Sequence, residues 1–147
     1  MTLRERLSEE MKDAMKSRDD LRLSAIRLIR SAVKNKDIEL KRELNDQEIV
    51  DVIATLVKQR RESIRLFSEA GRQELVEKEE KELAILLGFL PQQLTRAEVA
   101  ELVARTIAEC GAQGAKDMGR VMKALMPHVA GRADGKMVSD VVKEQLG

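Results

Sequence analysis

Basic side chains recur along residues 19–42 at the spacing of one helix face. Arg27, Arg30 and Lys34 are three and four residues apart, so a helix through this segment places all three on the same side. Between residues 22 and 42, seven lysines and arginines stand against two acids, although the whole chain has a formal net charge of +1. Such a row of cations can hold the phosphates of a nucleic acid without reading its sequence.

A second row with the same spacing follows in the next predicted helix. Its members are Lys58, Arg61 and Arg65. If the two helices pack antiparallel, the two rows border one groove and form a larger surface for phosphate backbone. The alternative is that these cations pair with the acidic segments 46–51 and 74–82 as ordinary surface salt bridges. Both interpretations remain open from the sequence.

A third basic set flanks a glycine-bearing turn near the C-terminus, residues 131–135, with the sequence GRADG. Its members are Lys123, Arg132 and Lys136. The turn precedes a last predicted helix, and helix N-termini favour anions, so we expect a phosphate contact here as well. The structural interpretation is that this region serves mainly as a turn and a helix cap. The residues predicted to form it are Gly119, Gly131, Asp134 and Gly135.

Side chains that catalyse reactions or bind metals are sparse. His128 is the only histidine and Cys110 the only cysteine, so neither a His- or Cys-rich metal site nor an internal disulfide is expected. We predict His128 near a helix C-terminus and Cys110 as a small buried or half-buried hydrophobe. The carboxylate clusters fall on predicted solvated helix faces. We therefore expect no cofactor, no metal and no catalysis by the chain alone.

The elements that position these residues are all predicted to be helices. Apolar residues recur with helical period, and no segment alternates as a strand does. Four helices are expected over about residues 2–17, 19–42, 45–71 and 72–87. Gly88 and Pro91 then interrupt the pattern. The prediction is an all-α chain: an N-terminal antiparallel helical domain of about four helices (1–92) and a small three-helix tail (93–147).

Helix starts are predicted from short polar motifs. Thr2 to Glu5, Asn45 to Glu48 and Thr95 to Glu98 each have the spacing of a capping box, in which two side chains satisfy the first free N–H groups. Asp117 is expected to cap the helix that begins beside it.

The amino-acid composition restricts which ligands and which cellular location are expected for the protein. Phe67 and Phe89 are the only aromatic residues, so base stacking of the kind used for single-stranded nucleic acid is not expected. No apolar run reaches the length of a membrane-spanning helix, about 18 residues. The first residues lack the apolar core of a signal peptide. These features predict a cytoplasmic protein.

Several segments together resemble the bacterial YqeY family. They are RLSAIRLIRSAVKNKDIE, LVKQRRESI, AGRQELVEKEEKEL, FLPQQL and KDMGRVMKALMPHVAGRADGKMVSDVVKEQL. The last is also similar to the tail domain of the B subunit of tRNA-dependent amidotransferases (GatB), which carries a related Gly-x-Val-Met-Lys segment, here residues 119–123. Where that tail has Gly-Lys-Ala-Asn-Pro, this chain has residues 131–135 with Asp-Gly in place of Asn-Pro.

The resemblance implies a connection with tRNA. The amidotransferase tail helps to hold charged tRNA, while the chemistry lies in parts that this chain lacks. Family-level descriptions give a carbon–nitrogen ligase activity with glutamine as amide donor, for which this chain shows no catalytic residues. The leading hypothesis is a non-catalytic tRNA-binding or amidotransferase-accessory protein, with tRNA or an aminoacyl-tRNA complex as partner.

The alternative hypothesis is a helical protein–protein adaptor with no nucleic-acid role. A Met-rich segment motivates it, because methionine suits adaptable surfaces that accept a partner helix. Its residues are Met118, Met122, Met126 and Met137. At helical spacing, methionine also serves as ordinary core.

Overall fold

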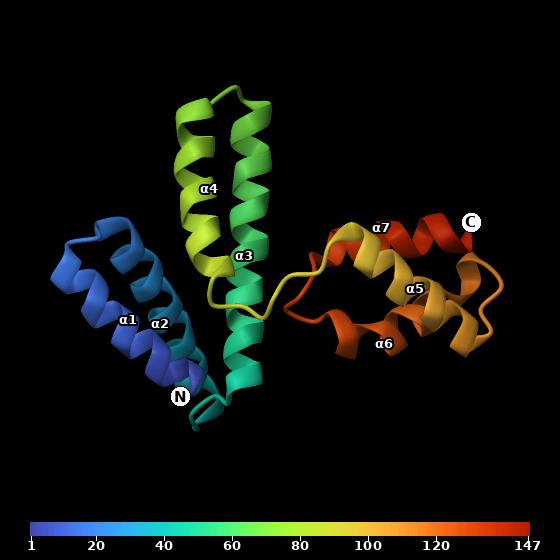
Figure 1. Ribbon diagram of the computed structural model, residues 1–147, viewed down its shortest axis with the longest axis horizontal. Coiled ribbons are helices and arrows are strands. Elements are labelled where there is room, and N and C mark those ends of the chain that lie inside the picture. The colour runs from blue at the N-terminus through green and yellow to red at the C-terminus, as the bar shows by residue number, and fades with distance from the viewer. The chain divides into compact units, whose positions relative to one another are not determined.

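The computed structural model describes residues 1–147 and consists of seven α-helices and one 3-10 turn, without a strand (Figure 1). The predicted all-α fold is therefore confirmed. The elements are α1 (Leu3–Ser17), α2 (Asp20–Leu40), α3 (Asp46–Glu69), α4 (Gln73–Leu87), α5 (Arg96–Cys110), η1 (Ala115–Asp117), α6 (Met118–Val129) and α7 (Gly135–Leu146). The chain divides into two compact units, residues 1–90 and 91–147. None of the helices has the length and apolar character needed to cross a membrane.

The helix starts follow the predicted capping motifs. At α3, the Asn45 side chain accepts the Glu48 N–H at 2.9 Å, and the Glu48 carboxylate accepts the Asn45 N–H at 3.1 Å. Thr95 and Glu98 form the same reciprocal pair at α5. Thr2 forms only one half of the box, by accepting the Glu5 N–H at 3.1 Å. Side chains therefore set where these three helices begin.

Helix α2 ends earlier than the sequence predicts. Lys41 adopts the left-handed conformation with a φ of 57°, and its N–H donates to the Ile38 carbonyl at 3.2 Å. The Arg42 N–H donates to the Asp37 carbonyl at 3.2 Å, so the last turn closes on itself. The predicted end at Arg42 is thus corrected to Leu40, because a lysine takes the position that glycine usually occupies.

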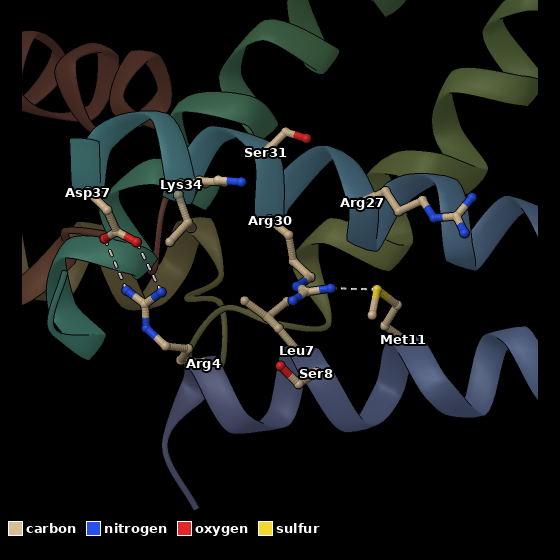
Figure 2. Close-up of a pocket in the computed structure, with 10 residues that line it drawn as sticks. Arg4, Leu7, Ser8, Met11, Arg27, Arg30, Ser31, Lys34 and Asp37 are labelled. Atoms are coloured by element: carbon tan, nitrogen blue, oxygen red, sulfur yellow. Dashed lines mark hydrogen bonds and ion pairs between the residues drawn. The ribbon is translucent and has the colours of Figure 1, made fainter. Parts of the chain in front are cut away.

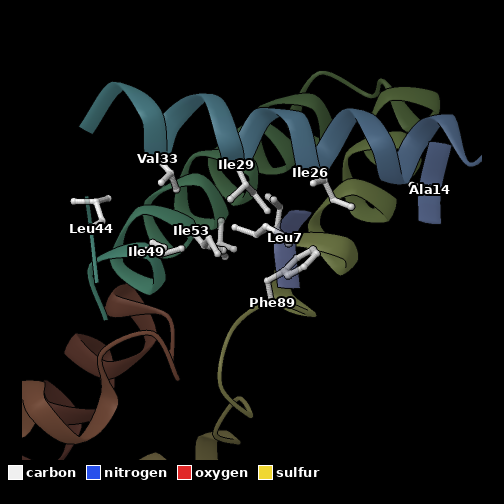
Figure 3. Packing of buried hydrophobic residues seen from close by; sticks show 11 residues of the cluster. Leu7, Ala14, Ile26, Ile29, Val33, Leu44, Ile49, Ile53 and Phe89 are labelled. Atoms are coloured by element: carbon white, nitrogen blue, oxygen red, sulfur yellow. The ribbon is translucent and has the colours of Figure 1, made fainter. Parts of the chain in front are cut away.

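Unit 1 (residues 1–90) packs around an aliphatic core. The side chains of Ile26 and Ile29 on α2 meet Ile49 and Ile53 on α3, and all four are fully buried (Figure 3). Helices α3 and α4 run side by side as a long hairpin (Figure 1). Burying a side chain of this size contributes about 1.5–3 kcal/mol, so this cluster holds the four helices together.

One aromatic ring completes that core at the end of the unit. Phe89 follows α4 and is 2% exposed. The guanidinium groups of Arg6 on α1 and Arg22 on α2 lie 4.7 and 5.8 Å from its ring centroid, and both also pair with the carboxylate of Glu10. The Arg6 side chain donates to the Gly88 carbonyl at 2.8 Å. These contacts attach the segment after α4 to the first hairpin.

Unit 2 (residues 91–147) has its own valine- and leucine-rich core. Val99 and Val103 of α5 pack with Val121 and Leu125 of α6 and with the valines of α7. Three of the four methionines in the Met-rich segment, those at positions 118, 122 and 137, are partly buried against this core. Only Met126 is largely exposed, at 45%. Most of the segment that motivated the adaptor hypothesis is therefore packed against the core of unit 2 and only partly exposed.

Two predicted caps in unit 2 are not formed by side chains. Asp117 ends η1, and its carboxylate accepts the Gln113 N–H at 3.0 Å and pairs with Arg120 at 3.1 Å. Asp134 occupies the position before α7 in an extended conformation, but its carboxylate makes no capping hydrogen bond. For Asp117 the reason is the 3-10 turn, which directs the carboxylate back to the loop before it.

Candidate anion-binding groove

A groove of about 560 Å³ lies between α1 and α2 (Figure 2). Its walls combine basic, hydroxyl and apolar side chains from both helices. The lining residues are Arg4, Leu7, Ser8, Met11, Arg27, Arg30, Ser31, Val33, Lys34 and Asp37. The groove thus includes the complete first basic row of the sequence.

The geometry of α2 explains why these cations border the groove. Ile26, Ile29 and Val33 form the buried stripe of the helix. Each member of the basic row follows one of these residues directly, and successive residues are about 100° apart around a helix. Each cation therefore lies about 100° around the helix from a buried residue. This places the basic row at the edge of the buried surface of α2.

The first hairpin brings α1 against this edge. Arg18 takes a left-handed conformation with a φ of 57° and ends α1. The Asp19 side chain then accepts the Arg22 N–H at 3.1 Å and starts α2. Because the connection is this short, the helices are antiparallel neighbours, and Arg4 near the start of α1 lies opposite Asp37 near the end of α2.

The cations of the row have no carboxylate partner. None of Arg27, Arg30 and Lys34 makes an ion pair, and all three are exposed. The Arg30 side chain extends from α2 toward α1, where its guanidinium contacts the sulfur of Met11 (Figure 2). A thioether is a weak acceptor and does not neutralise the charge. The row therefore provides three positive charges available to an anion.

An acid–base pair closes one end of the groove. The Arg4 guanidinium donates two hydrogen bonds to the Asp37 carboxylate, each 3.1 Å long (Figure 2). The Leu44 N–H donates to the same carboxylate at 2.8 Å. The hydrogen bond from Arg4, together with that from Leu44, holds the pKa of Asp37 below its usual value. The pair has no net charge, so the positive charge that favours an anion lies along the rest of the groove.

The second predicted row lies elsewhere. The groove between α2 and α3, about 470 Å³, is lined by residues such as Lys36, Glu48 and Asp51 and contains no member of either basic row. Neither of these two grooves brings the two rows together. The reason is that α2 presents its basic row to α1 and presents Ala32 and Lys36 to α3.

Arg65 in the second row is engaged by acids of its own helix. Its guanidinium pairs with Glu62 and, at 2.7 Å, with Glu69. The side-chain hydrogen bond to Glu62 raises the pKa of Arg65. Lys58 is exposed and Arg61 half-buried. Arg65 thus forms surface salt bridges, as the alternative interpretation predicts. Its partners, however, lie outside the acidic segments 46–51 and 74–82.

Those acidic segments instead pair with arginines outside the predicted rows. Arg42 holds Glu48 at 2.7 Å. Arg60 on α3 holds both Glu79 and Glu82 on α4, at 2.5 and 2.8 Å. These pairs support the packing of unit 1 and leave the first row without an acidic partner.

The third basic set does not form a cluster of hydrogen-bonded groups. Arg132 is half-buried, and its side chain donates to the Gln92 carbonyl at 3.4 Å while its own carbonyl accepts the Leu94 N–H at 2.7 Å. Lys123 on α6 and Lys136 on α7 are exposed without an ion pair. Arg132 therefore fastens the start of unit 2 to the turn.

The predicted turn residues differ in role. Gly131 has a φ of 73°, which glycine adopts at little cost. Gly119 and Gly135 instead lie in the first turns of α6 and α7, and a Cβ at either position would meet nothing within 4 Å. The conformation of the turn thus depends on Gly131 alone among these glycines.

The sequence did not identify the α1 side of the groove. Arg4, Ser8 and Met11 have the spacing i, i+4, i+7 on α1, which is the same helical signal that revealed the row on α2. Only one of the three is a cation, so the pattern does not stand out in the sequence as a basic row. Their proximity to α2 becomes visible once the hairpin is known.

Known proteins similar to this chain place it in a family. The family described as Yqey-like protein matches residues 4–146. This chain belongs to the YqeY-like family. The match includes both units, and therefore both the α1–α2 groove and the turn at Gly131.

Fungal relatives of this YqeY-like protein carry the name altered inheritance of mitochondria protein 41, mitochondrial. The protein of Pyrenophora tritici-repentis is 32% identical over 145 residues, which cover 97% of this chain and 80% of that protein. The protein of Lachancea thermotolerans is 38% identical over 67% of this chain, and that of Kluyveromyces lactis is 42% identical over 56%. The matched regions span only 53% and 45% of the latter two proteins.

These names correct one expectation. The cytoplasmic localisation predicted from the sequence is contradicted, because the relatives are named as mitochondrial proteins. The physical reason is that composition bears on solubility, and a signal peptide bears on secretion. Neither feature distinguishes the cytoplasm from the interior of an organelle.

Proposed function

We propose that this YqeY-like protein binds the phosphate backbone of tRNA through the α1–α2 groove and acts as a non-catalytic accessory protein. The observation that carries the proposal is the row of Arg27, Arg30 and Lys34, three neighbouring cations on one helix face without a carboxylate partner. Several other lysines and arginines of the chain also lack an ion pair, but these three lie three and four residues apart on one helix and line one groove. What distinguishes the row is therefore its clustering together with its free charge.

The absence of carboxylate partners favours an external anion. A phosphate that approaches the row does not have to displace a carboxylate, so the attraction is not offset by a broken ion pair. Ser8 on α1 and Ser31 on α2 also line the groove, and their hydroxyl groups can donate to phosphate oxygens. Hydroxyl and guanidinium donors together are the groups that fix a nucleic-acid backbone in register.

The choice of tRNA rests on the sequence resemblance to the amidotransferase B-subunit tail. The segment Gly119 to Lys123 and the turn at Gly131 carry that likeness, and the tail helps to hold charged tRNA. Family-level descriptions give a carbon–nitrogen ligase activity. An accessory protein is consistent with that description if it associates with such a ligase and other proteins supply the catalytic groups. In this proposal, tRNA or an aminoacyl-tRNA complex is the partner.

The test is binding of purified tRNA across a salt series by fluorescence anisotropy. We expect the logarithm of the association constant to fall linearly with the logarithm of salt concentration, with a slope of about −2 to −3 for about three neutralised phosphates. The variant R27A/R30A/K34A is expected to bind about 10- to 100-fold more weakly, since each cation removed loses one charged contact. Absence of binding by the parent at low salt would refute the proposal.

A matched control separates the groove from the total charge. The variant K78A/K81A/R105A removes the same number of positive charges from exposed positions without ion pairs on α4 and α5. It is expected to bind tRNA within about twofold of the parent, because none of the three side chains lines the groove, so the phosphate contacts proposed there stay intact. Equal losses in both triple variants would show that binding follows net charge and not the groove.

A further inference from the structure

We infer that the α1–α2 groove selects double-stranded RNA over single-stranded RNA. This inference rests on the proposed function and specifies the form of RNA that the groove takes. Three features carry it: the position of the aromatic rings, the fixed spacing at which the cations are attached, and the acid–base pair at one end.

No aromatic ring is available for a base to stack upon in the groove. Phe89 is 2% exposed and lies beneath Arg6 and Arg22. Phe67 is half-buried on α3, outside the groove. Proteins that bind single strands gain about 1–3 kcal/mol from each base stacked on an aromatic side chain. This groove lacks that contribution, so what it offers a nucleic acid is contact with the backbone.

The helix backbone fixes the spacing at which the cations are attached, and this spacing suits an ordered nucleic-acid backbone. Arg27 and Lys34 are seven residues apart on one helix, which corresponds to about 10 Å along its axis. Helix α2 is fixed by three fully or nearly fully buried residues directly beside the row, Ile26, Ile29 and Val33. A duplex presents phosphates at set positions before it binds. A single strand must first be ordered, and that costs conformational entropy.

The paired residues at one end limit how long the contact is. Arg4 is engaged by Asp37, so this neutral pair offers no net positive charge to a phosphate that follows the groove past Lys34. The favourable length therefore covers a few phosphates only. A short contact without stacking suits the shape and hydroxyl groups of an A-form stem, which proteins bind largely without reading its sequence.

The experiment compares RNA ligands of equal phosphate number. The probes are a fluorescent RNA duplex of about 16 base pairs, a second duplex of scrambled sequence, and a non-pairing single strand with the same number of phosphates as the first duplex. Binding to the full chain is measured at one salt concentration. We expect both duplexes to bind equally and at least about tenfold more tightly than the single strand, a difference of about 1.4 kcal/mol.

The outcomes separate this inference from the proposed function. A single strand that binds as tightly as the duplexes, with both weakened in R27A/R30A/K34A, overturns the duplex preference and keeps phosphate binding by the groove. No binding of any probe refutes both. A difference between the two duplexes greater than about tenfold demonstrates sequence readout and contradicts the backbone-only contact on which the inference is argued, since a mismatched base pair costs about 1–3 kcal/mol only where bases are read.

Discussion

The carboxylate of Asp37 near the end of α2 holds the guanidinium of Arg4 near the start of α1 through two hydrogen bonds of 3.1 Å. These residues are 33 positions apart in the chain, and their pairing has two consequences. It fastens the first hairpin, and it keeps one arginine of the groove neutralised. The pair therefore stabilises the hairpin but reduces the positive charge that the groove offers to an anion.

Removing the charge of Asp37 is expected to strengthen tRNA binding while it lowers stability. The D37N variant releases Arg4 as a fourth cation and removes the one carboxylate that lines the groove. We expect tRNA affinity to rise about two- to fivefold, in line with the modest free energy of an exposed ion pair, and the Tm to fall. Anisotropy titration and thermal unfolding measure the two effects.

The control for that variant is D13N, which removes the same charge from an exposed position of α1 outside the groove. It should alter affinity by less than about twofold, because Asp13 does not line the groove and holds none of its cations. Unchanged or weaker binding by D37N would contradict the role assigned to the pair.

Acid is expected to destabilise unit 1 at a pH set by Glu48. Arg42 donates to both oxygens of this carboxylate at 2.7 Å, and the Asn45 N–H donates to it as well. These bonds lower the pKa of Glu48 from 4.5 to about 2. A lowered pKa favours the charged form in the folded state, so this stabilisation is complete above pH 4.5 and is lost as the pH falls from about 4.5 to about 2.

The measurement is Tm as a function of pH for the parent and for E48Q, which keeps an acceptor for the cap but cannot titrate. E48Q should show a smaller decrease in Tm across that interval. The control E9Q alters an exposed glutamate of α1 that has no ion pair, and its Tm should depend on pH as that of the parent does. Identical pH profiles for E48Q and the parent would argue against the assigned pKa.

Two glycines of unit 2 should respond in opposite ways to alanine. Gly131 has a φ of 73°, where a Cβ costs about 1–2 kcal/mol. Gly119 lies in the first turn of α6 with open space where a Cβ would go. G131A is therefore expected to destabilise the protein by about that amount, and G119A to stabilise it by up to about 1 kcal/mol. Chemical denaturation of both variants tests the difference, and equal effects would contradict it.

Most of the fold was predictable from local patterns. Apolar spacing located the seven helices, and reciprocal caps such as Asn45–Glu48 and Thr95–Glu98 located two of their starts. Both motifs act within four residues, so the sequence contains all that determines them. The cap predicted at Asp117 failed because a 3-10 turn intervenes and offers its carboxylate another donor.

The candidate site was predictable only in part, because its partners are distant in sequence. Helical spacing identified Arg27, Arg30 and Lys34 as one face, but it could not show that α1, rather than α3, lies beside that face. It also could not distinguish a cation without a partner from one that is paired, such as Arg65. Pairing depends on where the side chains meet after folding, and charge counts along the chain do not contain that information.

Phe89 has a consequence for how the chain folds during synthesis. The ring that completes the interior of unit 1 comes from the last residues of that unit, while the arginines above it, Arg6 and Arg22, come from the first hairpin. The hairpin emerges from the ribosome first. Helix α3 then supplies Ile49 and Ile53 to the same core, but the part that Phe89 covers stays exposed until nearly all of residues 1–90 have followed. Unit 1 is thus expected to complete its core in a late step, and the emerging hairpin to need protection from aggregation until then.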